Sequence, residues 1–198
     1  MEIEFVKVLN PWGESYGGNQ SSFQNQPNGK RIKRCGCGLM AVCDMTLFLQ
    51  KNNRLPWTEY VKFVCDKAKN LGITDTLGIP PKKMIKMLAK SNPDYDFSFI
   101  PKGRLSENEL RDTIRKSLTT GFPVIIRAGE NFRKLPYKMN GAVYRMRWHY
   151  FTVTGIEDDT LTFCSWGRKG EMLCSDLYRF FGFTGGVITA ERKNPEKN

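Results

Sequence analysis

Histidine, long apolar runs and closely spaced cysteine pairs are scarce in this chain of 198 residues. No apolar run reaches the roughly 18 residues that a membrane-spanning helix needs. Residues 1–5 lack the basic segment and apolar stretch of a signal peptide. Six cysteines are too few for a disulfide scaffold. We therefore expect reduced thiols, no membrane span and a cytoplasmic location, although a secreted chain trimmed of its signal would look the same.

Acidic residues are outnumbered by basic ones, and the formal net charge is +11. Such a surface attracts anions without specificity, but the basic residues are scattered, apart from clusters at 30–34 and 82–90. No zinc-finger, helix-turn-helix or RNA-binding motif is present. Without paired Cys-x-x-Cys clusters, Cys35, Cys37 and Cys43 make a poor zinc site. We expect no specific nucleic-acid partner, metal or cofactor, and the charge hints at an acidic substrate.

Helical periodicity in the first half of the chain gives way to alternation in the second, which predicts an α+β fold. We expect a single domain over 1–198, with a mainly helical lobe over about 10–121 and an antiparallel β lobe over about 122–192. The expected helices are 37–50, about 58–71, one that begins at 80–81, and one from a capping box at 106–109 to about 121. The expected strands are 3–9, 95–100, 123–128, 142–147, 149–156, 160–163 and 186–191, and residues 10–34 are expected to form a loop.

The candidate nucleophile is Cys37, which opens the predicted helix 37–50. This helix is apolar nearly all round, so it should be buried on all sides, with Asp44 as its one charged residue. A helix N-terminus lowers the pKa of a thiol, and Gly36 and Gly38 would leave room for a substrate carbonyl. Cys35 also precedes a glycine and is an alternative nucleophile. The two cysteines can equally be small buried residues at a tight turn.

The candidate base is His149, because no other histidine is available. It begins a predicted strand next to Trp148, and a hairpin joins this strand to the next. The residues before Trp166, at the end of the partner strand, should therefore lie close to His149. A tryptophan there would shield the imidazole from water, although a core aromatic at a strand end is the commoner use.

Three short motifs together resemble those of the papain-like cysteine peptidases. Cys37–Ala41 is similar to the family's Cys-Gly-x-x-Ala helix, His149–Gly155 to its histidine strand, and Cys164–Gly167 to its Asn-Ser-Trp-Gly. The chain looks closest to compact bacterial members such as the double-glycine-leader peptidases of bacteriocin export. The resemblance implies a papain-like fold with the nucleophile on a buried central helix. It also implies hydrolysis of a peptide or amide through a thioester on Cys37, with His149 as its acid and base.

Two departures from the family's pattern concern the partners of the nucleophile and the base. The asparagine that orients the histidine falls on Cys164, and a thiol is a poor hydrogen-bond acceptor. Ser165 or a backbone carbonyl is the substitute to expect. The glutamine of the oxyanion hole has three candidates, Gln20, Gln24 and Gln26, of which we favour Gln20 in Gly-Gly-Asn-Gln.

Three functions remain open from the sequence. The first is a cysteine peptidase or amide hydrolase that uses Cys37, His149 and Gln20, with Gly36, Gly38, Trp148 and Trp166 around the substrate. The second is an acyltransferase of the same fold, because a fold does not determine the acyl acceptor. The third is a peptidase-like binding module that has lost catalysis, which the cysteine at position 164 favours.

Overall fold

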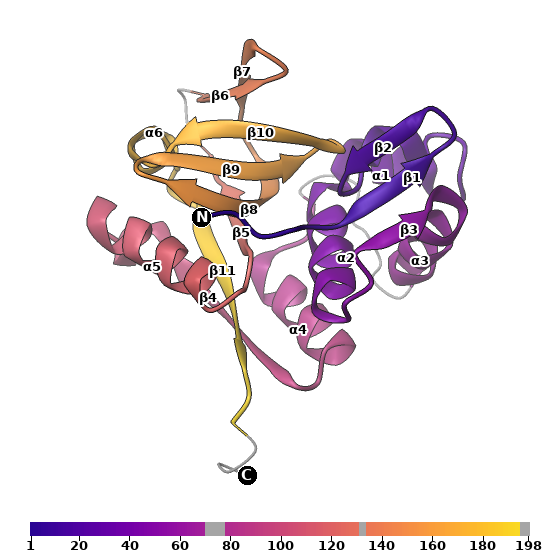
Figure 1. The fold of residues 1–198 in the computed structure, drawn as a ribbon, viewed down its shortest axis with the longest axis horizontal. Helices are drawn as coiled ribbons and strands as arrows, with labels where there is room; N and C mark the ends of the chain where they lie inside the picture. The colour runs from indigo at the N-terminus through magenta and orange to yellow at the C-terminus, as the bar shows by residue number, and fades with distance from the viewer. Residues whose placement is uncertain (70–77, 131–133, 195–198) are drawn as a thin grey trace.

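The computed structural model describes residues 1–69, 78–130 and 134–194 (Figure 1). The helical elements in these residues are η1 (Gln20–Phe23), α1 (Gly29–Cys35), α2 (Cys37–Leu49), α3 (Trp57–Lys69), α4 (Pro81–Ser91), η2 (Lys102–Arg104), α5 (Glu107–Thr119) and α6 (Cys174–Phe180). The strands are β1 (Lys7–Asn10), β2 (Gly13–Tyr16), β3 (Arg54–Pro56), β4 (Tyr95–Pro101), β5 (Val124–Ala128), β6 (Leu135–Met139), β7 (Ala142–Met146), β8 (His149–Glu157), β9 (Thr160–Ser165), β10 (Arg168–Leu173) and β11 (Gly186–Arg192). The predicted α+β class is confirmed.

Helix α2 is the buried centre of the N-terminal part of the molecule. Eleven of its thirteen residues are buried, and α1, α3 and α4 pack against it. Its sequence has no polar face, so only a position enclosed by other elements removes its apolar side chains from water. The prediction of a fully buried helix from Cys37 is confirmed.

The starts of two other helices follow from local chemistry. Pro81 is the first residue of α4. Proline has no N–H group, and the N–H at this position has no acceptor within the helix, so no hydrogen bond is lost. Ser106 and Glu109 form the predicted capping box at α5: the Ser106 Oγ accepts from the Glu109 N–H, and Glu109 Oε2 accepts from the Ser106 N–H. Each pairing satisfies an N–H that the helix itself leaves without a partner.

Eight strands form one antiparallel sheet in the order β4-β11-β5-β8-β9-β10-β6-β7. Strand β8 lies in its middle and pairs with β5 on one side and β9 on the other. Both faces of β8 are buried, since eight of its nine residues are inaccessible to water. The residues that begin β8 and end β9 are therefore held by neighbours on both sides.

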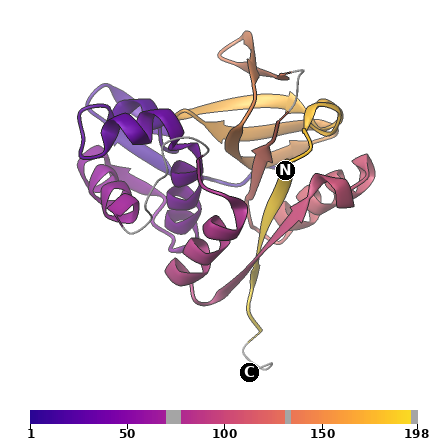
Figure 2. The same ribbon diagram turned by 180° about the vertical axis from the view of Figure 1, so that it is seen from behind.

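The large sheet is covered on both faces, as β5 illustrates. Ile125 packs into the core that α2 and α4 share, whereas its neighbours Val124 and Ile126 pack into the core of α5 and α6. Successive side chains on a strand point to opposite faces, so α2 and α4 lie on one face and α5 and α6 on the other. Figure 2 shows the N-terminal helices and α5 on opposite sides of the sheet.

The segment predicted to be a loop, residues 10–34, contains regular structure, so this prediction was wrong. Strand β2 pairs with β1, which also pairs in parallel with β3 to make a small second sheet. Helices η1 and α1 follow, and they pack against each other. Each of these elements is short and rich in polar residues or glycine, so periodicity did not reveal them.

The expected strands 142–147 and 160–163 are present, but β6, β10 and α6 were not anticipated.

Strand β4 and helix α5 contact the large sheet, which holds most of the strands expected in the β lobe. Strand β4 pairs with β11 in the large sheet, and α5 packs against β5, β8 and β11. Strand β4 also packs against α4, and its Phe97 lies in the core that α2 and α4 share. The end of the predicted helix 58–71 lies outside the described residues. In the described part of the chain, no helix is long and apolar enough to cross a membrane.

Candidate active site

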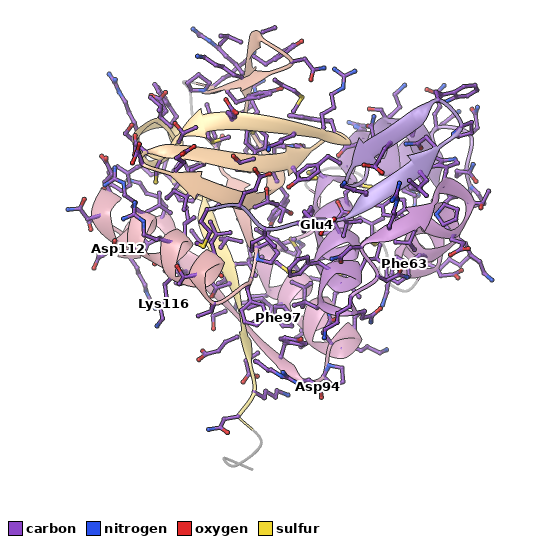
Figure 3. All side chains as sticks on the ribbon, viewed as in Figure 1. Glu4, Phe63, Asp94, Phe97, Asp112 and Lys116 are labelled. Carbon is purple, nitrogen blue, oxygen red and sulfur yellow. The ribbon has the colours of Figure 1, made fainter. Side chains whose placement is uncertain are left out.

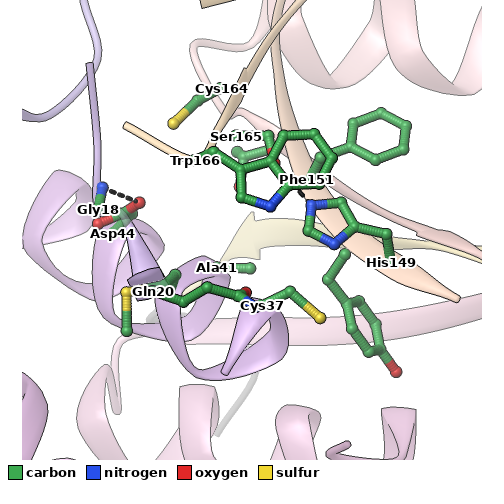
Figure 4. A pocket seen from close by; sticks show the side chains of 13 residues that line it. Gly18, Gln20, Cys37, Ala41, Asp44, His149, Phe151, Cys164, Ser165 and Trp166 are labelled. Carbon is green, nitrogen blue, oxygen red and sulfur yellow. Dashed lines mark hydrogen bonds between the residues drawn. The ribbon is translucent and has the colours of Figure 1, made fainter. Parts of the chain in front are cut away.

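The predicted nucleophile and base line one cavity, where α2 meets the edge of the β-rich lobe. Cys37 is the first residue of α2 and His149 the first of β8, and these two elements pack together. Gln20, Ser165 and Trp166 line the same cavity. Figure 4 shows the Cys37 side chain and the His149 ring facing each other across it. Cys35, the alternative nucleophile, does not line this cavity.

His149 is held by two neighbours from the β9 side of the hairpin. Its Nε2 lies 2.6 Å from Ser165 Oγ, and its ring stacks on Trp166 with centroids 4.0 Å apart and planes 10° from parallel. The other face of Trp166 stacks on Tyr137 at 5.6 Å. The Trp166 ring therefore covers one face of the imidazole, and Ser165 is the side chain that contacts its Nε2.

Burial keeps the imidazole neutral. Only 7% of His149 is exposed, and burial lowers its pKa from 6.5 to about 3 because the charged form loses its hydration. A neutral ring that donates Nε2–H to Ser165 Oγ keeps a lone pair on Nδ1. The geometry thus suits a proton acceptor that is uncharged at rest.

The Cys37 thiol is also held in its neutral form. Burial raises its pKa, and hydrogen bonds from the backbone at Tyr150 and Gly38 offset part of that rise. The bond from Tyr150 puts the sulfur beside the first two residues of β8. The helix N-terminus was expected to lower this pKa, so the structure corrects that expectation: loss of hydration outweighs its effect.

Close contacts surround both glycines that flank Cys37, and they exclude a side chain at Gly36. A Cβ on Gly36 would lie 2.2 Å from the carbonyl oxygen of Ile32, which real structures do not tolerate. A Cβ on Gly38 would lie 3.2 Å from the Tyr150 ring. These glycines therefore allow α1 to turn into α2 and allow α2 to approach β8.

Gln20 is the one of the three candidate glutamines that lines the cavity with Cys37. Its Nε2 donates to the carbonyl of Lys33 at 2.9 Å, which leaves one amide hydrogen uncommitted. Gln24 instead accepts from the Lys33 ammonium at 2.6 Å, and Gln26 is not part of the cavity wall.

Cys164 does not take the place of the orienting asparagine. Its thiol donates to the carbonyl of Tyr16 at 2.9 Å, and burial raises its pKa well above 9. The neighbouring Ser165 makes the contact with His149. Of the two substitutes expected from the sequence, Ser165 or a backbone carbonyl, the Ser165 side chain is the one that contacts the imidazole.

Comparisons with known proteins bear on the fold. No model of a protein family matches the sequence, and no curated protein matches it. A solved structure described as a C39-like peptidase from Bacillus anthracis matches with a TM-score of 0.51 and 11% identity, over 81% of this chain and 90% of that one. The peptidase domain of Streptococcus ComA, a bifunctional ABC transporter of a quorum-sensing pathway, matches with a TM-score of 0.48 and 14% identity, over 81% and 93%.

The chain has a papain-like peptidase fold. The predicted fold class is therefore confirmed. At 11% identity the likeness concerns the fold alone, and the roles of individual residues rest on the geometry of this chain.

Within this papain-like fold, Asp44 is a site residue whose role the sequence did not reveal. It lines the same cavity as Cys37, and its carboxylate accepts from the Gly18 N–H at 3.0 Å (Figure 4). It also accepts from the Tyr60 hydroxyl at 2.6 Å. Burial raises its pKa from 3.8 to about 6, although both hydrogen bonds act in the opposite direction. The sequence showed a single charged residue in an apolar helix. It could not show the hydrogen-bond partners of Asp44, because Gly18 and Tyr60 lie in distant segments of the chain.

Asp44 ties the loop that carries Gln20 to the helix that carries Cys37. Gly18 has no space for a side chain, because a Cβ would lie 1.8 Å from the Tyr60 hydroxyl. Gly17, with a φ of 70°, lies against Asp44 and Cys164. The loop is thus pressed onto α2 two residues before Gln20.

Proposed function

We propose that this protein is a cysteine peptidase or amide hydrolase, with Cys37 as its nucleophile and His149 as its general base. The observation that carries the proposal is the pair Cys37 and His149 in one cavity, with His149 oriented by Ser165 and covered by Trp166. A nucleophile, a base and a group that orients the base are the parts that covalent acyl transfer requires. The papain-like fold supports it as an analogy.

The first half of the reaction starts from a neutral thiol and a neutral imidazole. As the Cys37 sulfur attacks the carbonyl carbon of the substrate, its proton moves to Nδ1 of His149. In the tautomer that carries its proton on Nε2, this N–H donates to Ser165 Oγ throughout, and the contact of 2.6 Å holds the ring in that orientation. The imidazolium then gives the proton to the leaving amine nitrogen as the C–N bond breaks, which leaves a thioester on Cys37.

The second half of the reaction regenerates the enzyme. His149 removes a proton from a water molecule that attacks the thioester carbonyl. The C–S bond then breaks, the carboxylic acid product leaves and the proton returns to the thiol. Burial of the charged imidazole is costly, so it persists only while it is paired with the negative charge of the intermediate.

The oxyanion formed in both halves needs hydrogen-bond donors. The Cys37 N–H lies at the first residue of α2, where a helix leaves its N–H groups without intrahelical acceptors. The uncommitted hydrogen of the Gln20 amide is the second donor. In comparable sites one such donor contributes roughly 3 kcal/mol to transition-state stabilisation.

A peptide-cleavage assay with two cysteine variants tests the proposal. Wild-type protein is incubated with a mixed peptide library, and new termini are identified by mass spectrometry. We expect cleavage by the wild type, and loss of at least about a thousandfold of it in Cys37→Ala. Cys65→Ala is the matched control and should keep its activity, because Cys65 lies on α3 and lines neither of the cavities beside His149. Full activity of Cys37→Ala would contradict the proposal.

A second candidate function is peptide binding without catalysis. It is favoured by the directions of the two pKa shifts, since a neutral thiol and an imidazole with no carboxylate partner are not activated at rest. The same library separates the two candidates. If wild type and Cys37→Ala retain the same peptides and neither cleaves any of them, the chain is a binding module.

A further inference from the structure

A second cavity opens beside Cys37 and offers the room that the first cavity lacks. The first has a volume of about 10 Å³, enough for about one water molecule. The second has a volume of about 320 Å³ and shares Cys37, His149 and Tyr150 with the first. Of these two cavities, only the second can hold a substrate side chain next to the reacting carbonyl.

Two arginines from different elements line this second cavity. Arg34 comes from the last turn of α1 and Arg127 from β5. Arg127 Nη1 donates to the carbonyl of Thr184 at 2.8 Å, which anchors its guanidinium and leaves its remaining N–H groups uncommitted. Burial raises the pKa of Tyr150, and the positive charge of Arg127 offsets part of that rise, so the guanidinium lies near the Tyr150 phenol.

Neither charge is neutralised by a side chain that the structure describes. No Asp or Glu is among the described residues that line this cavity, and neither arginine has an ion-pair partner in those residues. Arg34 is exposed and Arg127 half-buried. Two guanidinium groups with uncommitted donors next to a nucleophile form a site for an anion, and their planar, forked donors match a carboxylate.

Trp148 makes the apolar part of the same wall. It has a φ of 51°, and 43% of its surface is exposed. A bulky residue in the left-handed region is uncommon, and here it stands between Arg147 and the candidate base. A cavity with an aromatic wall and a cationic end suits the short aliphatic stem and the carboxylate of an acidic side chain.

We propose that this second cavity binds the carboxylate of an Asp or Glu residue next to the bond that the enzyme cleaves. The proposal names the substrate class for the proposed peptidase function, and it rests on that function. The acyl transfer itself is unchanged: Arg34 and Arg127 position the substrate and do not act on the reacting atoms.

The test uses two electrophiles that differ only in charge, bromoacetyl-Glu-amide and bromoacetyl-Gln-amide. Each alkylates Cys37 in one displacement, in which the C–S bond forms as the C–Br bond breaks and bromide leaves. The reaction needs no turnover, so it reports on the cavity even if the chain is not a peptidase. Rates are followed by mass spectrometry of the Cys37 peptide. We expect the Glu reagent to react about fivefold faster or more with the wild type.

Matched arginine variants assign this preference to the cavity. In Arg34→Gln and Arg127→Gln the ratio of the two rates should fall towards one. Arg145→Gln removes the same charge from an exposed position on β7 and should keep the ratio of the wild type. Equal rates in the wild type would overturn the proposal, as would an equal loss in Arg145→Gln, which would mean a general attraction by the basic surface. Because Arg34 is exposed, its variant tests the idea even if Arg127→Gln fails to fold.

A peptide experiment separates failure of this inference from failure of the proposed function. Matched peptides carry Glu, Gln or Lys on either side of the cleaved bond, and Arg34→Glu should shift the preference from Glu to Lys. Cleavage without preference for Glu, together with equal alkylation rates, overturns the acidic site and leaves the peptidase intact. If no peptide is cleaved but the alkylation ratio is preserved, the anion site stands and the proposed peptidase function is wrong.

Discussion

At the scale of single residues, the contact between Ser165 and His149 decides how the base is oriented. A hydroxyl at 2.6 Å holds the ring without adding charge, so nothing offsets the loss of hydration that lowers the pKa of His149 to about 3. A carboxylate in that position would favour the imidazolium instead. The serine hydroxyl adds no negative charge, so the imidazole of His149 stays neutral in the resting site.

Ser165→Ala should lower kcat by about tenfold or more with little change in KM, because it frees the ring to rotate. Ser165→Asp should move the acidic limb of the pH–rate profile to higher pH, because a carboxylate raises the pKa of His149. Steady-state kinetics between pH 4 and 9 measure both. Ser98→Ala, on an exposed position of β4, is the control. Unchanged kcat and an unmoved acidic limb would show that Ser165 has no orienting role.

At the scale of secondary-structure elements, α2 presents Cys37 at its start and Asp44 two turns later. The seven-residue spacing puts both on one face of the helix, which is the face that lines the cavity. Asp44 holds the loop before Gln20 through Gly18. One helix thus carries the candidate nucleophile and positions the candidate oxyanion donor.

The raised pKa of Asp44 predicts a dependence of stability on pH. Its pKa of about 6 in the folded state lies above the ordinary value of 3.8, so the folded chain keeps this proton to a higher pH than the unfolded chain. The contribution of Asp44 to stability is therefore full below about pH 4 and is lost as the pH rises to about 6. The loss is on the order of 3 kcal/mol.

Urea unfolding of the wild type and Asp44→Asn, at pH 4 and pH 7, measures this contribution. As the pH rises from 4 to 7, the wild type should lose unfolding free energy relative to Asp44→Asn. Asp112→Asn is the control, since Asp112 lies on the outside of α5 (Figure 3) and is exposed. Parallel pH profiles for wild type and Asp44→Asn would contradict the prediction.

At the scale of the whole molecule, the site depends on how closely the helical lobe approaches the β-rich lobe. Gly38 on α2 meets the ring of Tyr150 on β8, and the Tyr150 hydroxyl donates to the carbonyl of Ile79 at 2.8 Å. The backbone of Tyr150 also hydrogen-bonds the Cys37 sulfur. The distance between the lobes therefore sets the geometry around the nucleophile.

Gly38→Ala should reduce kcat/KM by about tenfold or more with a change in stability of less than about 1 kcal/mol. The added methyl group pushes α2 away from Tyr150, while alanine favours the helix over glycine by up to about 1 kcal/mol and offsets the clash. Peptide cleavage and urea unfolding measure the two quantities. Gly103→Ala is the control, because nothing lies within 4 Å of a Cβ there. Equal activity of Gly38→Ala and wild type would be the opposite of the expected result.

The elements that the sequence predicted well are those determined by local interactions. The buried helix α2, the capping box of α5 and the hairpin of β8 and β9 each follow from a periodicity or from neighbouring residues. Strand β7 was also found, but its partner β6 and the polar strand β10 were not. Strand β6 contains Pro136, and a proline argues against a strand. Strand β10 has large apolar side chains only at its last two residues, so little in its sequence indicated a strand.

The sequence by itself determined that His149 is the base if there is one, that Cys37 begins a buried helix, and that Trp166 lies near the imidazole. Each follows from composition, from helical period or from a hairpin between neighbouring strands. Only the tertiary structure decided that Ser165 and not Cys164 meets the imidazole, because adjacent residues on a strand point to opposite sides. It alone joined Asp44 to Gly18 and brought Arg34 and Arg127 to one cavity, since these segments come together only when the lobes pack and water is excluded.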